Sequence, residues 1–434
     1  MKKKLSRREF LEKTGKASLA AGALLMGTGL SRSIWASETK TGTLMNQFPT
    51  LNNQYWQDWN AGGAQAAEAV GIKYINQTFE DSVDKQLSQI ENCQSLGVNM
   101  IFMFSQNAAS SRKLISTAAD LGILVVNAHS NAYWSTPLDP EFKDYYVKYI
   151  EPHNVLGSYG MCVATFNQIG GKGKVINLSG IPGNWSNDLR VAGVDMALKE
   201  FPDIELVVRL NGGENRVAAA PIIENLLTAH PDVAAVVCHN DDSAIAVLNA
   251  LRERGMKNVK VGGVDAIDEF LTAMQKGPNA AASAAIHGSW LGGYAVVSAF
   301  DALNGLKLDP VERMIYQDVL TIDTPESAKA YQEMIYRPKK LPFDWKAMSR
   351  FLNPDTWNAQ NGILPINPNK FFWEEVVPDT QPTGWKLPEA YQKSIDAGNL
   401  EKYSQLYKQH FKGGPIAEVV ALTSSKKTVL GFTG

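Results

Sequence analysis

The sequence predicts a two-lobed α/β protein with an additional C-terminal region. Three observations support this prediction: apolar and helical segments alternate from residue 41, an aromatic segment interrupts the alternation midway, and the composition changes after residue 325. With 434 residues, the chain has room for about two to three domains. It is 44% hydrophobic and 20% charged, which is typical of a globular protein. Its formal net charge of -2 gives no basic excess of the kind that nucleic-acid binding requires.

Nine apolar runs are expected to form strands. They are TGTLM (41–45), IKYINQ (72–77), VNMIFMF (98–104), ILVVNA (123–128), KVINLSG (174–180), IELVVRL (204–210), VAAVVCH (233–239), VKVGGVD (259–265) and AAASAAI (280–286). Between them lie stretches with apolar residues at helical spacing, such as 82–97 and 220–231. Strands that alternate with helices of this length indicate βαβ units and parallel sheets. Nine strands are too many for one such unit, and the segment 137–154 interrupts the pattern, so two lobes are expected.

The region after residue 325 is expected to be an ordered extension packed on the core. From residue 336 it is rich in Pro, Asn and aromatic residues, and helical stretches follow at 388–396 and 400–411. Its large aromatic side chains are too numerous for a disordered tail; they include Trp345, Trp357, Phe371, Phe372, Trp373 and Trp385. Two roles are open for this extension: structural packing behind one lobe, or a contact at a cleft rim or between subunits.

Residues 1–36 have the pattern of an export signal. They contain eight Lys or Arg and two acidic residues, followed by the weakly polar run 17–31 and a small residue, Ala36. SRREFLEK (6–13) resembles the twin-arginine export motif. The alternative is a basic cytosolic N-terminus with a chance arginine pair. We expect a mature protein that begins near Ser37 and works in the periplasm after export in a folded state.

Sequence patterns for catalysis, metals or cofactors are lacking. No GxxxxGK[ST], GxSxG, HExxH or strand-linked GxGxxG motif occurs, and the six histidines have no metal-ligand spacing. The three cysteines, Cys93, Cys162 and Cys238, lie in apolar contexts and are expected to be buried free thiols. The acidic pair Asp241–Asp242 opens a predicted helix, where N-terminal capping is a simpler role than a metal or acid–base site. We therefore expect no cofactor, no bound metal and no enzymatic activity.

Polar and aromatic residues recur just after the predicted strands. Ligands of open α/β sheets bind at the carboxyl ends of the strands, so these positions are candidates for a binding site. They are Asn53, Tyr55, Trp56, Ser105, Asn107, Asn127, His129, Trp185, Arg190, Glu214, Asn240 and Asp265. Amides, isolated charges and flat rings without a nucleophile suit a polyhydroxylated ligand, whose hydroxyls need hydrogen-bond partners and whose C–H faces pack on rings.

Residues 41–320 resemble the ribose-type periplasmic sugar-binding proteins of ABC importers. The segments that carry the resemblance include TLNNQYWQDWNAGGAQAAEAVG (50–71), INLSGIPGNWSNDLRVAGV (176–194), IIENLLTAHPDVAAVVCHNDDSAIAVLNAL (222–251) and VGGVDA (261–266). The resemblance implies the type I periplasmic binding protein fold, with a ligand enclosed between two hinged lobes and an ABC permease as partner. It is also compatible with a chemotaxis or sensor receptor as a second partner.

The resemblance also implies boundaries for the lobes. The N-terminal lobe comprises residues 41–152 and 288–317, and the C-terminal lobe comprises 153–287 and 318–325. Three hinge crossings then fall near 152–153, 287–288 and 317–318. Residues 326–434 form the extension, about which the resemblance says nothing.

Individual roles follow from the same resemblance. Asn53 matches an amide that bonds a ligand hydroxyl, and Tyr55 and Trp56 match an aromatic pair that sandwiches the sugar ring. Arg190 matches an arginine that binds ring and hydroxyl oxygens. Asn240 and Asp265 match acceptors of the second lobe.

Three departures from the family pattern indicate a different ligand. Glu214 stands where ribose receptors have an aromatic residue. Ala128–His129 replaces an Asp–Arg pair that is usual in aldopyranose receptors. The glutamine expected near the second crossing is replaced by Ile286 or His287. We expect a polyol, a modified sugar, or a furanose or linear form.

Two other classes of protein fit the sequence less well. A secreted enzyme acting on a carbohydrate-like substrate would need a nucleophile–base pair or a metal cluster. A transcriptional regulator with the same core would need a DNA-binding helix-turn-helix before it, where residues 1–40 hold the export signal.

Overall fold

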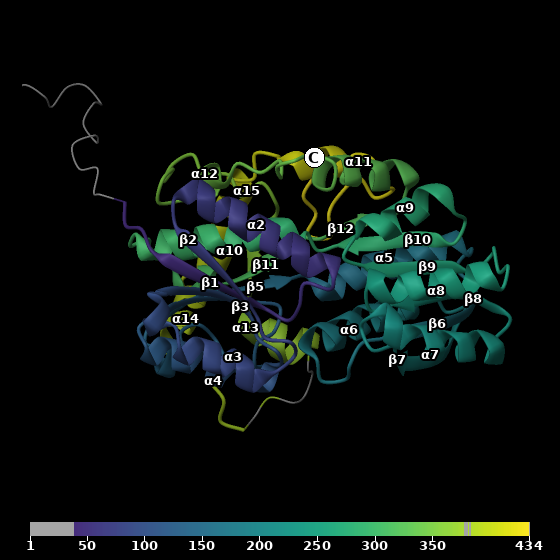
Figure 1. The fold of residues 1–434 in the computed structure, drawn as a ribbon, viewed down its shortest axis with the longest axis horizontal. Helices are drawn as coiled ribbons and strands as arrows, with labels where there is room; N and C mark the ends of the chain where they lie inside the picture. The colour runs from purple at the N-terminus through teal and green to yellow at the C-terminus, as the bar shows by residue number, and fades with distance from the viewer. Residues whose placement is uncertain (1–38, 377–380, 382, 434) are drawn as a thin grey trace, which may run out of the picture. The chain divides into compact units, whose positions relative to one another are not determined.

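Two mostly parallel β-sheets, each covered by helices, organise the protein (Figure 1). The computed structural model describes residues 39–376, 381 and 383–433. The predicted export signal, residues 1–36, lies outside the described residues. None of the helices in these ranges combines the length and the apolar character needed to span a membrane.

The first sheet has seven strands in the order β13-β11-β5-β4-β3-β1-β2, and the second has six in the order β12-β10-β9-β8-β6-β7. Strand pairs are parallel except β11–β13 and β10–β12, which are antiparallel. The strands are β1 Thr43–Phe48, β2 Lys73–Thr78, β3 Met100–Phe104, β4 Leu124–Ala128, β5 Tyr146–Pro152, β6 Gly173–Ser179, β7 Ile204–Asn211, β8 Val233–Cys238, β9 Lys260–Val264, β10 Ala280–Ala285, β11 Met314–Gln317, β12 Leu320–Ile322 and β13 Ile363–Pro365. We call the seven-stranded sheet with its helices the first lobe, and the six-stranded sheet with its helices the second lobe.

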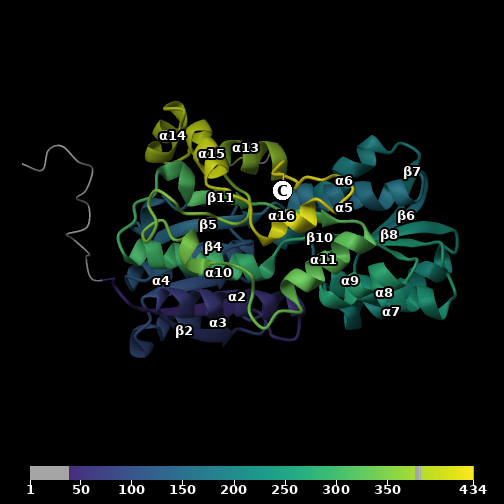
Figure 2. The same ribbon diagram turned by 90° about the horizontal axis from the view of Figure 1, so that it is seen from above.

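The helices that connect the strands cover both faces of each sheet. They are α2 Gln54–Val70, α3 Val83–Glu91, α4 Ala108–Asp120, α5 Asn154–Gln168, α6 Trp185–Glu200, α7 Arg216–Ala229, α8 Asp241–Glu253, α9 Asp268–Lys276 and α10 Gly288–Leu303. In the first lobe, α2 and α10 pack on one face, and α3 and α4 pack on the other (Figure 1). In the second lobe, α5 and α6 lie on one side of the sheet, and α7, α8 and α9 lie on the other (Figure 2). Covering both faces explains why central strands such as β3 are continuously apolar.

The nine predicted strands are all present, with small shifts at their ends. Four strands were not predicted. Strand β5 lies inside the segment that interrupts the pattern, because its sequence YVKYIEP carries Lys148 and Glu151 although every residue is buried. Strands β11, β12 and β13 have only three or four residues each, too few to produce a detectable alternation.

The aromatic residues near the start of α2 lie in a helix and not in a loop before it, so the expectation of a helical run starting at residue 60 was wrong. Helix α2 begins at Gln54, because the Asn53 side chain accepts a hydrogen bond from the backbone N–H of Tyr55 (2.8 Å) and caps the helix. Tyr55 and Trp56 are therefore in its first turn. Tyr55 is buried, whereas Trp56 is half-buried at the edge of the core.

The chain changes sheet at three closely spaced connections. They follow β5, β10 and β11, after Pro152, Ala285 and Gln317. Gln317 joins all three, because its backbone carbonyl accepts from the N–H of His153 (3.1 Å) and its Nε2 donates to the carbonyl of Ile286 (2.7 Å). The connections therefore behave as one bonded group between the lobes.

The extension after residue 325 packs against both lobes (Figure 2). Its elements are α11 Pro325–Ile335, α12 Trp345–Met348, β13, α13 Pro368–Lys370, the π-helical turn Phe371–Val376, α14 Glu389–Asp396, α15 Asn399–Gln409 and α16 Pro415–Val420. Helix α11 packs on α9 of the second lobe, and α12 packs on α2 and α10 of the first. Strand β13 adds an antiparallel edge to the first sheet. The extension is therefore part of the folded core, and one of its strands was not anticipated from sequence.

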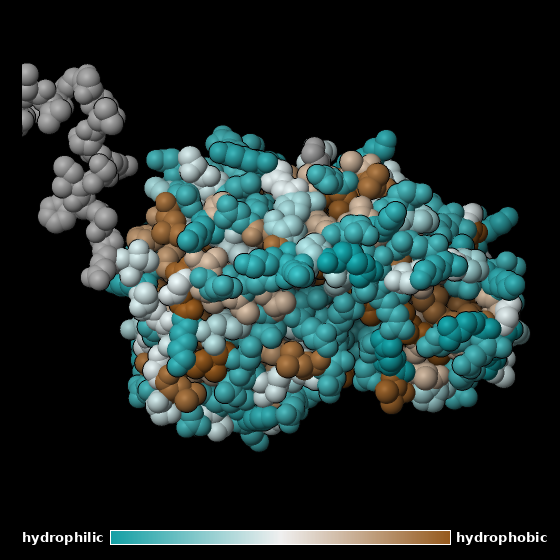
Figure 3. Space-filling model, turned by 45° about the horizontal axis from the view of Figure 1, so that its top comes forward, coloured by the Kyte–Doolittle hydropathy of each residue, from teal (hydrophilic) through white to brown (hydrophobic). Residues whose placement is uncertain are grey.

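The described surface is mainly hydrophilic, with apolar groups in separate small patches on the face shown in Figure 3. All three cysteines are buried and unpaired, as the sequence predicts. Of the predicted capping acids, Asp241 and Asp242 do lie in the first turn of α8, but the cap itself is Asn240.

Candidate ligand-binding site

A cavity of about 100 Å³ lies between the carboxyl ends of the strands of both lobes. Each lining residue follows a strand or begins the helix after it, as expected for parallel sheets. The lining consists of Asn53, Tyr55, Trp56, Phe104 and His129 from the first lobe, and Asn184, Ser186, Arg190, Glu214, His239, Asn240 and Asp265 from the second. Eight of these residues are predicted site residues, which the fold brings together from distant parts of the chain.

Aromatic rings dominate the first-lobe wall. The planes of Tyr55 and Trp56 make an angle of 74° with centroids 5.0 Å apart, and Trp56 meets Phe104 edge-on at 5.0 Å. Two rings at this angle cannot stack in parallel on opposite faces of a sugar. The expected sandwich by Tyr55 and Trp56 is therefore not the observed arrangement; the half-buried Trp56 is the ring best placed to present its surface to a ligand.

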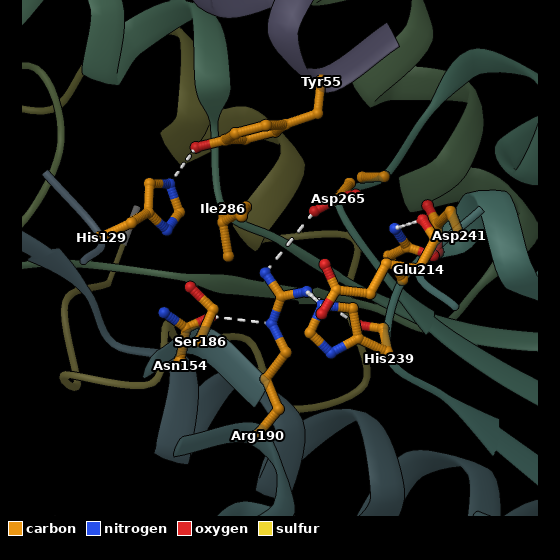
Figure 4. A network of polar contacts seen from close by, with 12 residues as sticks. Tyr55, His129, Asn154, Ser186, Arg190, Glu214, His239, Asp241, Asp265 and Ile286 are labelled. Carbon is orange, nitrogen blue, oxygen red and sulfur yellow. Dashed lines mark hydrogen bonds and ion pairs between the residues drawn. The ribbon is translucent and has the colours of Figure 1, made fainter. Parts of the chain in front are cut away.

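His129 is held rigidly beside these rings. Its backbone adopts a positive φ of 64°, its N–H bonds the carbonyl of Ile150, and its carbonyl accepts from the Tyr149 hydroxyl. Its Nε2 lies 2.5 Å from the hydroxyl of Tyr55 (Figure 4). Burial, reinforced by the nearby Arg190 charge, lowers the pKa of His129 to about 3. The imidazole is therefore neutral at physiological pH.

Arg190 is the cation of the second-lobe wall. Its Nε donates to Oδ1 of Asn154 (2.9 Å), and Nη1 donates to the carbonyl of His239 (2.8 Å). Nη2 lies 3.8 Å from Oδ1 of Asp265 (Figure 4). Since Nη1 also approaches Nε2 of His239 at 3.2 Å, three partners orient the buried guanidinium toward the cavity.

Two carboxylates accompany this arginine. Asp265 has a φ of 113°, and burial raises its pKa to about 7 although Arg190 partly opposes the shift. Glu214 has a φ of 57°, and its Oε1 accepts from the backbone N–H of Ile181 (2.9 Å). Burial also raises the pKa of Glu214. Left-handed backbone at non-glycine residues is costly, and here it aims both side chains at the cavity (Figure 4).

The loop that carries Glu214 is fixed by Asn240. The amide of Asn240 accepts from the N–H of Ser243 (2.9 Å) and donates to the carbonyl of Glu214 (2.8 Å). Much of its hydrogen-bonding capacity is thus used within the protein, and its principal contribution is to position Glu214.

Comparison with known proteins places these features in a family. Residues 47–307 match the model of the periplasmic binding protein domain. The chain belongs to this family. It is 25% identical over 290 residues to the ribose import binding protein RbsB of Bacillus subtilis, covering 66% of this chain and 91% of that protein. It is 27% identical over 212 residues to the xylitol-binding protein of Mycolicibacterium smegmatis, covering 49% and 58% of the two chains.

Solved structures show the same fold. A twin-arginine translocation pathway signal protein from Burkholderia phytofirmans is 27% identical, with a TM-score of 0.64 over 69% of this chain and 94% of that one. An ABC transporter periplasmic solute-binding protein from Actinobacillus succinogenes has a TM-score of 0.61 at 23% identity, over 67% and 100% of the two chains. The architecture is thus the type I periplasmic binding protein fold, with an extra C-terminal helical region.

Three predicted site residues lie outside the cavity lining of this periplasmic binding protein: Ser105, Trp185 and His287. Ser105 is buried and donates to Oδ1 of Asn127 (3.3 Å), and His287 lies 3.1 Å from the hydroxyl of Tyr331. At the second crossing it is Ile286, and not His287, that points toward Arg190 (Figure 4).

Trp185 joins the two lobes and the extension. Its Nε1 donates to Oε2 of Glu151 at the end of β5 (3.0 Å). Its ring packs on Tyr133 of the first lobe at 4.7 Å and on Phe371 of the extension at 5.7 Å. Sequence placed this ring at a strand end correctly, but the extension covers it.

Four lining residues were not predicted: Phe104, Asn184, Ser186 and His239. All four lie at or just after strand ends, so the rule that selected the other candidates covers these as well. Phe104 and His239 were counted as strand residues, and Asn184 and Ser186 flank Trp185 in the quoted NWSN segment. In the described ranges, no cluster of three or more His, Cys, Asp or Glu side chains could hold a metal ion.

Proposed function

We propose that this protein is the solute-binding component of an ABC importer and captures a sugar, polyol or related polyhydroxylated molecule between its lobes. The observation that carries the proposal is the cavity, whose two walls supply complementary groups from different lobes. Amides, a guanidinium and carboxylates bond hydroxyls, and an indole packs on C–H faces. The named functions of the 25–27% identical relatives, ribose import and xylitol binding, support the same ligand class.

Hinge motion between the lobes provides the route in and out. We propose lobes of residues 41–152 with 288–317 and of 153–287 with 318–325, joined at the connections that Gln317 bonds together. Only a closed form brings Trp56 and Arg190 to the same ligand, so ligand binding stabilises closure. The closed form is then the state that a permease recognises.

Ligand recognition is assigned to the lining residues. Arg190 and Asp265 bind hydroxyls, Asn53 and His129 contribute hydrogen bonds from the first lobe, and Trp56 packs on the ring. No hydrogen bond to Nδ1 of His129 occurs in the described part of the chain, which leaves this atom for the ligand. A micromolar affinity corresponds to about -8 kcal/mol, within reach of these contacts.

Calorimetry against a panel of pentoses, hexoses, polyols and inositols tests the proposal, and native mass spectrometry of the purified protein reveals any ligand that co-purifies. Binding of one class with a stoichiometry near one is the expected outcome. Failure to bind any polyhydroxylated compound would sink the proposal, and conversion of a bound compound to product would instead favour the enzyme alternative.

We further propose export by the twin-arginine route to the periplasm. The basis is SRREFLEK (6–13) together with the resemblance to a structure named for that pathway. Replacing Arg7 and Arg8 by lysine is expected to retain the precursor in the cytoplasm. Undiminished export of that variant would contradict the proposed route. A chemotaxis or sensor receptor remains a second proposed partner of the closed form.

For the extension we propose a structural role. It supplies strand β13 and covers Trp185, and it contributes no residue to the cavity lining. Tyr336 of the extension bonds Asp58 of the first lobe (3.0 Å) and the carbonyl of Ala266 in the second (2.9 Å), so it also ties the lobes together.

A further inference from the structure

The charges that line the cavity do not balance. Its lining holds one cation, Arg190, and two carboxylates, Glu214 and Asp265. The two lining histidines add no charge, because burial lowers the pKa of His129 to about 3 and that of His239 well below its ordinary value. With both carboxylates ionised, the lining carries one negative charge in excess.

Glu214 is the carboxylate without a cationic partner. Arg190 lies within 3.8 Å of Asp265, whereas no Arg or Lys nitrogen in the described residues lies within 4.0 Å of Glu214. Its polar neighbours are the N–H of Ile181 (2.9 Å), the amide of Asn184 (3.5 Å) and His239 (3.7 Å). These neutral groups hold the carboxylate in place but do not neutralise it.

The surroundings increase the negative potential at this point. Asp81 raises the pKa of Glu214 through its charge, and Asp242 does the same to Asp265. Asp242 is already paired with Arg216 (2.7 Å), so it is not available as a partner for a ligand. Glu214 itself is the carboxylate that remains accessible, with a side-chain exposure of 25% compared with 6% for Asp265.

Figure 4 shows where this carboxylate points. The side chain of Glu214 extends from the second-lobe wall toward Arg190, on the same side of the cavity as Asp265 and facing the wall that holds Tyr55 and His129. A ligand that contacts Arg190 therefore also meets Glu214. A hydroxyl there can donate one hydrogen bond, whereas an ammonium group can donate and also compensate the charge.

We propose that the ligand is an amino sugar or amino polyol, whose protonated amino group binds Glu214 while its hydroxyls bind Arg190 and Asp265. The inference rests on the proposed solute-binding function and names the ligand class for the same cavity. The ammonium group restores the charge balance of the closed cavity, where water no longer screens the carboxylate.

The proposal also predicts a proton linkage. Burial raises the pKa of Asp265 to about 7 and raises that of Glu214, so the empty cavity holds protons near neutral pH. An incoming ammonium group favours the ionised carboxylates, so binding releases protons. A neutral ligand has no such effect.

Calorimetry with matched pairs tests the ligand class. The probes are glucosamine with glucose and N-acetylglucosamine, galactosamine with galactose, and an amino-inositol with myo-inositol. We expect the amine of at least one pair to bind ten times or more tighter than its neutral counterpart, with proton release detected by repeating the titration in buffers of different ionisation enthalpy. Replacing Glu214 by glutamine, which preserves shape and the bond to Ile181, should reduce this preference to about twofold or less.

Glu224→Gln is the matched control, because Glu224 pairs with Arg254 on the surface, away from the cavity. It should keep the full preference for the amine. Neutral compounds that bind as tightly as their amines, or a preference that survives Glu214→Gln, would overturn this inference while leaving the proposed function intact. Absence of binding by every member, neutral and charged, would instead overturn the proposed function and the inference with it.

Discussion

The two walls of the cavity differ in chemistry. The first lobe presents the rings of Tyr55, Trp56 and Phe104 and a neutral histidine, with no charged side chain. The second lobe presents Arg190, Glu214 and Asp265. One wall therefore suits the apolar faces of a ligand, and the other suits its hydroxyls and charge.

This difference assigns separate tasks to the lobes. Packing on a ring is tolerant of ligand identity, because every sugar has C–H faces, whereas a fixed guanidinium and carboxylates require hydrogen-bond partners at defined positions. Selectivity is thus expected to reside mainly in the second lobe, and the first lobe contributes affinity on closure. The predictions below test this division.

The largest effect is expected for Arg190→Met. The variant leaves Asp265 and Glu214 without their neighbouring cation, and truncating one partner of a buried charge pair costs about 2–5 kcal/mol. Calorimetry should show affinity for the best panel ligand reduced by a hundredfold or more. Arg209→Met is the control, since Arg209 pairs with Asp195 outside the cavity; equal losses in both variants would contradict the assignment.

Asp265→Asn should change stability in a pH-dependent manner. Because burial raises the pKa of Asp265 from 3.8 to about 7, the folded state binds more protons than the unfolded state between these values. The contribution of Asp265 to stability therefore falls as pH rises from about 4 to 7 and is constant above. The variant removes this cost.

Thermal unfolding of the ligand-free protein measures the effect of Asp265→Asn. We expect a gain of about 1–3 kcal/mol at pH 8 and little change at pH 4, given 1.36 kcal/mol for each unit of pKa shift. Asp203→Asn, at an exposed position, should behave as the unmodified protein at both values. A variant that is less stable at pH 8 would show that the ionised Asp265 stabilises the empty cavity.

Trp56→Ala tests the ring wall. Loss of one packing ring should cost about 1–1.5 kcal/mol, or roughly tenfold in affinity, and by similar factors for all ligands that bind. Trp134→Ala, at a ring that is 41% exposed and outside the cavity, should leave affinity unchanged. A loss confined to one ligand would mean that the first lobe also selects.

The smallest effect is expected for Tyr55→Phe. The substitution removes the hydroxyl that lies 2.5 Å from Nε2 of His129 but keeps the ring. Losing one hydrogen bond should weaken binding by about 1 kcal/mol, or fivefold, through a less fixed imidazole. Tyr145→Phe provides a comparison in the same lobe; a tenfold or greater loss only in Tyr55→Phe would indicate direct ligand contact by the hydroxyl.

Sequence predicted much of the fold because buried parallel strands are apolar and their connections are helical. Strand β3, MIFMF, illustrates the clear cases, and β5 the failure, since buried Lys148 and Glu151 break its pattern. The polar positions after the strands were found by the same logic, as for Arg190 and Asp265. Trp185 shows its limit: a ring at a strand end is a candidate until another segment covers it.

The sequence by itself determined the alternation of strands and helices, and therefore the edge of each sheet at which polar side chains gather, because hydrophobic periodicity is a local property. Only the tertiary structure decided which of these side chains share the cavity, since that depends on contacts between residues far apart in the chain. Packing of Trp185 against Phe371 removed one candidate from the cavity lining, and the separation of Glu214 from any Arg or Lys nitrogen gave the cavity its charge.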